Sequence, residues 1–560
     1  MRITNKIIQN NSLSNINLAK VAEDAKSSQV SSGKKIVRPS DDPIVAIRSL
    51  RLRSSVVEIT QYYSRNAKDA EAWLKTTEDA MQQVTDVITD MITQYNKGAN
   101  EYLTSNERDI ILEQLRELQK QVYATGDADY AGRYIFTGYR TESSLMFRED
   151  TEKTYQITEQ FTAADLKTDT YVKTNYPDVD EDGNPLTENG QQVYRDLTNL
   201  KEGTQSYYEN VDEDKIDKVD YHRIRLSYKD CDDNAIPVIT YRNAAGQDVR
   251  IDAQGMSIDG APDGVTPPMR LAKSTDVPSP YTNVGDDDVI YLSDTGELLL
   301  GENIYKELSG LVDDPNTSNV NEGEIQISYQ KTNFKDGDLK PEHYFYCVAA
   351  GDDGTFETNL GEKPELSSTD IVYNPKYLQH GQERQVIEYD VGYNQRLQVN
   401  TIAEECFNPA VNREVDDMIQ ALEQMKKTED VVNTLKSLLS NETNADKQKV
   451  LQKQLDAANK ALTYEREVVQ RKFSSGLSAM QGFLNEVNVA ATSCGARGSR
   501  LDLVASRLSS QKTTFETLKS ENEDVDLSEA VVELTSAEMT YEAALKATGK
   551  IMQVNLMDFI

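Results

Sequence analysis

The sequence predicts an α+β protein in which long helices from both ends of the chain flank a β-rich centre. Apolar residues recur at steps of three and four up to about residue 126 and again from residue 412, which is typical of helices that pack as coiled coils. Between these regions, from about 131 to 401, short β-branched and aromatic runs alternate with Asn-Gly and Asp-Gly turns. At 560 residues the chain is too long for one core, so we expect roughly three or four domains, some of them discontinuous.

Both ends of the chain are predicted to be helices with one apolar side. On the N-terminal helix this side holds Ile3, Ile7, Leu18 and Val21. On a C-terminal helix over 527–556, about 45 Å long, it holds Leu527, Val531, Leu534, Tyr541, Leu545 and Met552. Paired only with each other, such helices bury too little apolar area to offset the entropy that ordering costs. We therefore expect them to be loose in the free chain and to gain a core by packing against other chains.

The segment after the first helix is predicted to be a hinge. Gly33 is suited to the position just past a helix C-terminus, and Pro39 prevents its predecessor from being helical. Asp41 or Asp42 then supplies N-cap oxygens, and Pro43 occupies the first position of a new helix. The two carboxylates could instead bind a metal or act as an acid/base pair. However, no His, Cys or third carboxylate lies within ten residues, so capping is the favoured interpretation.

The next helices have continuous apolar stripes, which we interpret as core packing between helices. The first stripe comprises Ala70, Leu74, Thr77, Met81, Val84, Ile88, Met91 and Tyr95, and the second Ile111, Leu115, Leu118 and Val122. In the second half of the chain the stripes begin at Val415, Leu451 and Leu501.

One acidic stretch in the β-rich centre resembles a calcium loop. Asp178, Asp180 and Asp182 have the spacing of the first three ligands of an EF-hand loop. The position that should hold a bidentate Glu is Asn189, and Pro177 argues against a preceding helix. An Asp-Gly turn without an ion is therefore favoured, and calcium binding is the weaker alternative.

The charge balance and the other motifs exclude several classes of function. Sixty Lys and Arg residues against 94 Asp and Glu give a net charge of −34, which repels nucleic acids and anionic membranes. No apolar run is long enough to span a membrane, and the N-terminus lacks the features of a cleaved signal peptide. The four cysteines are widely spaced and are expected to be buried thiols, and the three histidines are isolated. We predict no enzyme activity and no cofactor.

Four segments resemble the flagellin family. SSGKKIVRPSDDP, residues 31–43, resembles the N-terminal signature of that family, although Ile and Val follow the proline where Ala-Gly is usual. GDADYAGRYIFTGYRTESSLMF (126–147) and VIEYDVGYNQRLQVNTIAEECF (386–407) are similar to segments of its hook-associated branch, where the chain leaves and re-enters the helical body. The ending, residues 524–560, also resembles the branch that joins hook to filament.

The resemblance implies a flagellin-like architecture of three parts. Residues 1–38 and 525–560 would form a terminal helical domain that lines an inner tube. Residues 39–147 and 386–524 would form a helical body with a small β-hairpin, and 148–385 an outward-facing β-rich insertion of one or two domains.

The resemblance also implies a function and partners. The subunit would form a homo-oligomeric ring at the junction of hook and filament in the extracellular flagellum, after type III export without a cleaved signal. It would contact another hook-associated junction protein on the hook side and flagellin on the filament side. A cytoplasmic export chaperone would hold the C-terminal helix near Leu534, Tyr541, Leu545 and Met552.

Two rival functions remain open. The protein could be a flagellin variant that forms filaments by itself, which would differ in the extent of self-assembly. It could also be a secreted adhesin or binding protein, and residues 148–385 would then have a specific ligand.

Overall fold

The chain divides into two compact units in the computed structural model. The terminal unit comprises Met1–Ala72, Glu388–Gln398 and Ala496–Ile560, and the central unit comprises Trp73–Ile387 and Val399–Gly495. The structure describes residues 5–100, 103, 105–177, 186–188, 191–192, 194–196, 213–262, 267–312, 323–351, 370–378 and 385–557.

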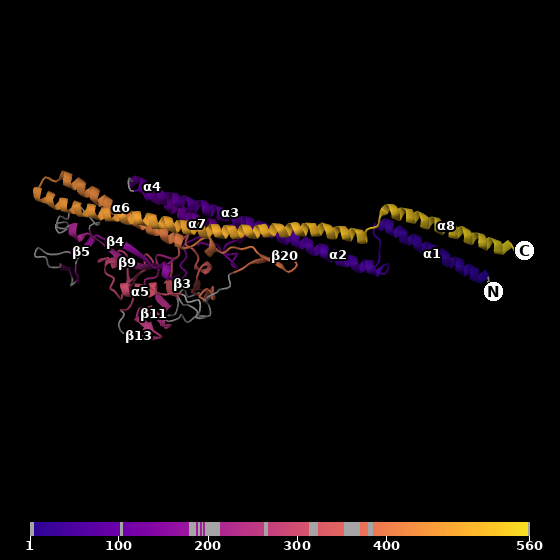
Figure 1. Ribbon diagram of the computed structural model, residues 1–560, viewed down its shortest axis with the longest axis horizontal. Coiled ribbons are helices and arrows are strands. Elements are labelled where there is room, and N and C mark those ends of the chain that lie inside the picture. The colour runs from indigo at the N-terminus through magenta and orange to yellow at the C-terminus, as the bar shows by residue number, and fades with distance from the viewer. Residues whose placement is uncertain are drawn as a thin grey trace. The chain divides into compact units, whose positions relative to one another are not determined.

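Long helices make up both ends of the chain, and a β-rich segment lies between them, as the α+β prediction requires (Figure 1). The helices of the N-terminal part are α1 (Asn5–Ser32), α2 (Pro43–Gln61), α3 (Ala67–Gly98) and α4 (Ser105–Gly126), with one π-helical turn, Tyr62–Asn66, between α2 and α3. A short helix, α5 (Glu302–Ser309), lies in the β-rich part. The C-terminal helices are α6 (Ala410–Asn441), α7 (Ala445–Glu523) and α8 (Leu527–Met557). The predicted α+β class is confirmed.

Helix α7 runs without interruption where the sequence shows two separate apolar stripes. It contains Gly476, Gly482, Gly495 and Gly498, which cost about 1 kcal/mol each in a helix but do not break it. Its residues up to Gly495 belong to the central unit, and those from Ala496 onward belong to the terminal unit.

The central unit buries the predicted helical stripes. On α3 the side chains from Leu74 to Tyr95 in the stripe are almost fully buried, and so are Ile111, Leu115 and Val122 on α4. Helix α4 packs against α6, whose Val415, Met418 and Leu422 are buried as well. The interpretation of these stripes as helix–helix core packing is therefore confirmed.

Two antiparallel-rich sheets form the β part of the central unit. The larger has eight strands in the order β13-β12-β11-β10-β17-β3-β18-β19, all antiparallel. The smaller has five strands in the order β14-β15-β16-β9-β4, of which only the β14–β15 pair is parallel. Separate two-stranded pairs are β1-β2, β5-β8, β6-β7 and, in the terminal unit, β20-β21.

The strand bounds follow the runs of β-branched and aromatic residues. In the large sheet they are β3 (Tyr155–Thr162), β10 (Val238–Arg242), β11 (Asp248–Asp252), β12 (Gly255–Ile258), β13 (Ala261–Pro262), β17 (Glu324–Lys331), β18 (Tyr346–Ala349) and β19 (Ile371–Tyr373). In the small sheet they are β4 (Lys167–Lys173), β9 (Asp217–Arg225), β14 (Arg270–Ala272), β15 (Val289–Leu292) and β16 (Glu297–Leu300). The pairs are β1 (Asp129–Tyr130), β2 (Arg133–Tyr134), β5 (Asn175–Pro177), β6 (Thr187–Glu188), β7 (Gln191–Gln192), β8 (Tyr194–Asp196), β20 (Glu388–Gly392) and β21 (Gln395–Gln398).

Burial along the strands explains how the sheets are held. Strand β17 alternates between buried and half-buried residues, so Ile325, Ile327 and Tyr329 share one face. Strands β15 and β16 are buried on both faces, and all their residues are apolar or aromatic except Glu297 at the start of β16. The four cysteines are buried free thiols, as predicted.

The compact units do not coincide with the three domains expected from the sequence. Residues 39–72 and 496–524 fall in the terminal unit, together with the end helices and the hairpin β20-β21. The β-rich insertion falls in one unit with most of the helical body. The three-part division therefore stays a prediction about how the regions act in an assembly.

Candidate functional site: apolar faces of the terminal helices

Helices α1 and α8 form an antiparallel pair in the terminal unit (Figure 1). Ala530 is buried in the pair, whereas Ile8, Ile16 and Ala19 on α1 and Leu534 and Tyr541 on α8 are only half-buried. An ion pair between Lys26 and Glu533 adds one polar contact. The pair therefore has a thin core, as expected for two half-apolar helices.

The predicted apolar stripe of α1 does not face α8. Ile7, Leu18 and Val21 are 50%, 66% and 67% exposed. They lie on a different side of the helix from Ile8 and Ile16, which α8 partly covers. Ile3 lies outside the described residues. In the single chain this side of α1 has no apolar partner among the described residues, although burying it would be favourable by about 25 cal/mol per Å² of apolar area.

Part of the predicted apolar stripe of α8 is exposed to solvent, and part of it is half-buried. Leu527, Val531 and Leu545 are exposed, whereas Leu534 and Tyr541 at the edge of the stripe turn toward α1. Val532 and Met539, which the sequence analysis did not single out, are exposed too. Met552 belongs to α8, but its side chain is outside the described part.

Helix α2 adds a further apolar surface that the sequence analysis missed. Ile44, Ile47, Leu50 and Val57 are all more than half exposed. The signal was present in the run PIVAIRSLRLRSSVV, where apolar residues recur around the whole helix rather than on one side. Such a helix needs partners on more than one face. We call the exposed residues of α1, α2 and α8 the apolar faces of the terminal unit.

The hinge residues act on the backbone. Gly33 has a φ of 67°, and its N–H donates to the Gln29 carbonyl at 2.9 Å, so it ends α1 in the left-handed conformation. The carboxylate of Asp41 accepts hydrogen bonds from the N–H groups of Val37 and Arg38. The carboxylate of Asp42 also accepts hydrogen bonds from backbone N–H groups, those at the start of α2.

Asp42 is the N-cap residue of α2. Its Oδ1 accepts hydrogen bonds from the N–H groups of Ile44 and Val45 at 2.9 and 3.1 Å, and Pro43 occupies the first turn. These contacts satisfy N–H groups that have no partner inside the helix. This geometry is that of a cap rather than of a metal ligand.

A polar joint connects the hinge to the end of α7. We define the polar joint as Lys34, Ser49, Arg53, Glu523 and Asp524. Arg53 binds the Glu523 carboxylate through Nε and NH2 at 2.6 and 2.8 Å, and Ser49 donates to it at 2.5 Å. Lys34 pairs with Asp524 at 2.5 Å. The hydrogen bond from Arg53, followed by that from Ser49, outweighs burial and lowers the pKa of Glu523 to about 2.

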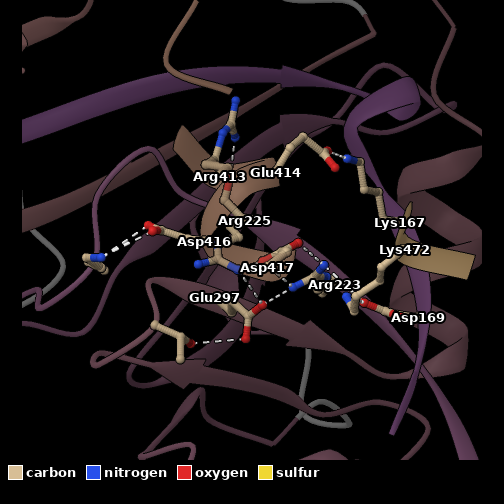
Figure 2. Close-up of polar contacts among 12 residues, drawn as sticks. Lys167, Asp169, Arg223, Arg225, Glu297, Arg413, Glu414, Asp416, Asp417 and Lys472 are labelled. Carbon is tan, nitrogen blue, oxygen red and sulfur yellow. Dashed lines mark hydrogen bonds and ion pairs between the residues drawn. The ribbon is translucent and has the colours of Figure 1, made fainter. Parts of the chain in front are cut away.

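A second charged cluster, in the central unit, joins the small sheet to the helices. We call it the docking cluster and define it as Asp169 (β4), Arg223 and Arg225 (β9), Glu297 (β16), Asp417 (α6) and Lys472 (α7), as Figure 2 shows. Arg223 pairs with Glu297, with Asp417 and, at 3.1 Å, with Asp169. Lys472 pairs with Asp169, and Arg225 with Asp417. Three cations thus balance three carboxylates.

Burial and pairing shift the ionisation of this cluster in opposite directions. Burial alone would raise the pKa of Glu297, but the charges of Arg223 and Arg225 and a hydrogen bond from Tyr281 lower it to about 2. Burial, reinforced by the positive charge of Arg223, lowers the pKa of Lys472. Two further ion pairs link the β-rich part to the helices, Lys218 of β9 with Glu467 of α7 at 2.7 Å and Lys229, which follows β9, with Asp416 of α6 at 3.2 Å.

The described residues offer little for catalysis or metal binding. Among them no group of three His, Cys, Asp or Glu side chains is placed to hold a metal ion. His343 donates a hydrogen bond from Nε2 to the Ser144 carbonyl, and burial of the imidazole lowers its pKa to about 4. The weak calcium candidates Asp178, Asp180 and Asp182, and also His380, lie outside the described residues. None of the described helices combines the length and the apolar character that a membrane span needs.

Comparison with known proteins finds similarity to bacterial flagellin at both ends of the chain. The bacterial flagellin N-terminal helical region matches residues 3–141, and the bacterial flagellin C-terminal helical region matches 477–560. The chain is 31% identical to flagellar hook-associated protein 3 of Escherichia coli over 123 residues, which are 22% of this chain and 38% of that protein. It is 28% identical to the Salmonella typhimurium protein of the same name, over 26% of this chain and 45% of that protein. The chain thus spans less than half the length of these curated relatives.

Two solved structures cover more of the chain than the curated relatives do, but their sequence identity is lower and their TM-scores are low. FlgL of Xanthomonas campestris is 12% identical, with 84% of this chain and 99% of that chain covered and a TM-score of 0.25. The flagellar junction protein FlgL of Legionella pneumophila is 9% identical, with 79% and 99% covered and a TM-score of 0.18. The N-terminal and C-terminal helical regions of bacterial flagellin thus match the two ends of the chain, with α1 and α8 at the outer ends of the matched regions.

Proposed function

We propose that the protein is a structural subunit of the bacterial flagellum that forms the junction ring between hook and filament. The observation that carries this proposal is the exposure of the apolar faces on α1, α2 and α8, which a single chain leaves without a core. Buried in an assembly of many copies, these faces would stabilise it by the area they remove from water. The matched relatives are named as hook-associated proteins, and the final segment of the chain resembles the same branch.

The partners follow from this position. The ring is a homo-oligomer that contacts another hook-associated junction protein on one side and flagellin on the other. Its place is the extracellular flagellum, reached by type III export. Ile7, Leu18 and Val21 of α1 and Leu527, Val531 and Leu545 of α8 are the described residues that supply the contacts between subunits.

An export chaperone would cover α8 before assembly. Leu545 and Met539 are exposed, and Leu534 and Tyr541 are only half-buried. An unassembled chain with these side chains available is prone to associate wrongly. A chaperone that binds the α8 segment removes this hazard, and a chain that ends before residue 527 would no longer co-purify with it.

Assembly seen by electron microscopy tests the proposal. Purified protein is mixed with isolated hook ends and flagellin monomers, and filaments are scored in the presence and absence of each component. A junction subunit caps hook ends, grows no long filament alone and allows flagellin to grow from the capped end. Long filaments of the protein alone would identify a flagellin variant and overturn the junction assignment.

A further inference from the structure

A partly open cavity of about 670 Å³ lies beside the docking cluster in the central unit. Strand β4 contributes Lys167 and Thr168 to its wall, and the docking-cluster residue Arg223 contributes from β9. The helical wall includes Glu414 of α6, and α7 supplies Arg471, Lys472, Ser474 and Ser475. Its volume is in the range of small-molecule sites, and its wall joins the sheet to two helices.

The side chains that line the cavity include one more cation than carboxylates. Its cations are Lys167, Arg223, Arg471 and Lys472, and its carboxylates are Asp169, Glu414 and Asp417, so four minus three leaves a net charge of +1. Lys167 pairs with Glu414, Lys472 with Asp169 and Arg223 with Asp417. Arg471 forms no ion pair with any residue that the structure describes, so the surplus charge is on its guanidinium.

The hydroxyl groups of the wall are suited to accept hydrogen bonds. Ser474 Oγ donates to the Gln470 carbonyl at 3.0 Å, and Ser475 Oγ donates to the Lys472 carbonyl at 3.2 Å. With their protons committed to the helix, both oxygens keep lone pairs for hydroxyl groups of a ligand.

We propose that this cavity binds a small hydroxylated monocarboxylate with the size and chemistry of a sugar acid. The planar guanidinium of Arg471 can hold the carboxylate through two parallel hydrogen bonds. One negative charge neutralises the wall, whereas a phosphate dianion would leave it negative beside three carboxylates. The ligand's hydroxyl groups donate to Ser474 and Ser475. This site is independent of the proposed flagellar role.

The test is a calorimetric titration of the full-length protein with D-glucuronate at constant ionic strength. D-glucose and inorganic phosphate serve as comparison ligands, and Arg500→Gln serves as the control, since Arg500 is an exposed arginine of the same helix away from the cavity. Glucuronate is expected to bind saturably and to raise the thermal midpoint of the central unit, because it binds only the folded site. Arg471→Gln is expected to weaken binding at least about tenfold, and Arg500→Gln to leave it unchanged.

Three results would overturn the proposal. They are no saturable glucuronate binding, phosphate binding as tight as that of glucuronate, or unchanged glucuronate affinity in Arg471→Gln. Fluorescence of Trp73, which is buried in the central unit, verifies that each variant is folded. Ser474→Ala provides a second variant, and it should weaken binding of glucuronate more than binding of acetate, which has no hydroxyl group to donate.

Discussion

Arg53 and Glu523 meet through two parallel hydrogen bonds of 2.6 and 2.8 Å, which join α2 to the end of α7 although 470 positions separate the two residues in the chain. The Glu523 side chain is only 4% exposed, so its charge depends on these partners. The polar joint therefore links α2, which follows the hinge after α1, to the end of α7, which precedes α8.

Glu523 makes the stability of the terminal unit depend on acid pH. Its pKa is lowered from 4.5 to about 2 in the folded chain, so its stabilisation is complete above about pH 4.5 and is lost as the pH falls from there toward 2. Glu523→Gln should cost about 2 kcal/mol at neutral pH and flatten this dependence. Urea unfolding followed by circular dichroism across this pH range measures both effects.

The control for that experiment is Glu521→Gln, which changes an exposed carboxylate of the same helix. It should leave both the neutral stability and the acid dependence as they are in the unaltered chain. Equal pH profiles for Glu523→Gln and the unaltered chain would contradict the assignment of the acid transition to the polar joint.

Gly33→Ala should destabilise the terminal unit through the backbone alone. No atom lies within 4 Å of a Cβ built on Gly33, but its φ of 67° is unfavourable for alanine by about 1 to 2 kcal/mol. Gly498→Ala in α7 is the matched control, since it also meets no atom and lies inside a helix, where alanine is favoured by about 1 kcal/mol. Opposite signs in the two free energies of unfolding are expected, and stabilisation by Gly33→Ala would refute the left-handed hinge.

Removal of Arg223 should destabilise the central unit more than any surface ion pair does. Arg223→Met leaves the buried carboxylates of Glu297 and Asp417 with fewer partners, at an expected cost of about 3 to 5 kcal/mol. Arg242→Met, which removes the pair with the exposed Asp248, should cost less than about 1 kcal/mol. Denaturant unfolding detected by Trp73 fluorescence compares the two, and equal costs would show that the docking cluster does not hold the sheet.

The sequence was sufficient for the fold class and for the helices of the central unit. The stripe from Leu74 to Tyr95 on α3 is regular because the same face packs against neighbours along its whole length, and such a face leaves a clear periodic signal. The hinge also has a local signal, because Asp42 binds amides only two and three residues away. Both features depend on near neighbours in the chain.

The charged clusters could not be predicted, because their partners come from distant segments. Glu523 is one of many acidic residues, and nothing near it in the sequence indicates Ser49 or Arg53. The docking cluster takes residues from three strands and two helices, so it exists only once the sheet is formed against α6 and α7. The stripe on α8 was predicted as one surface, but Leu534 and Tyr541 at its edge turn toward α1, which no pattern within α8 could reveal.

The central claim is that the apolar faces of the terminal unit build the flagellar assembly, and one variant tests it most directly. Leu18→Ser combined with Val21→Ser removes two exposed apolar side chains of α1 without disturbing its contact with α8, and Val312→Ser, at an 80% exposed position of the central unit, is the control. In hook-capping assays scored by electron microscopy, the double variant should stay monomeric and fail to support flagellin growth, while the control caps normally. Normal capping by the double variant would contradict the account.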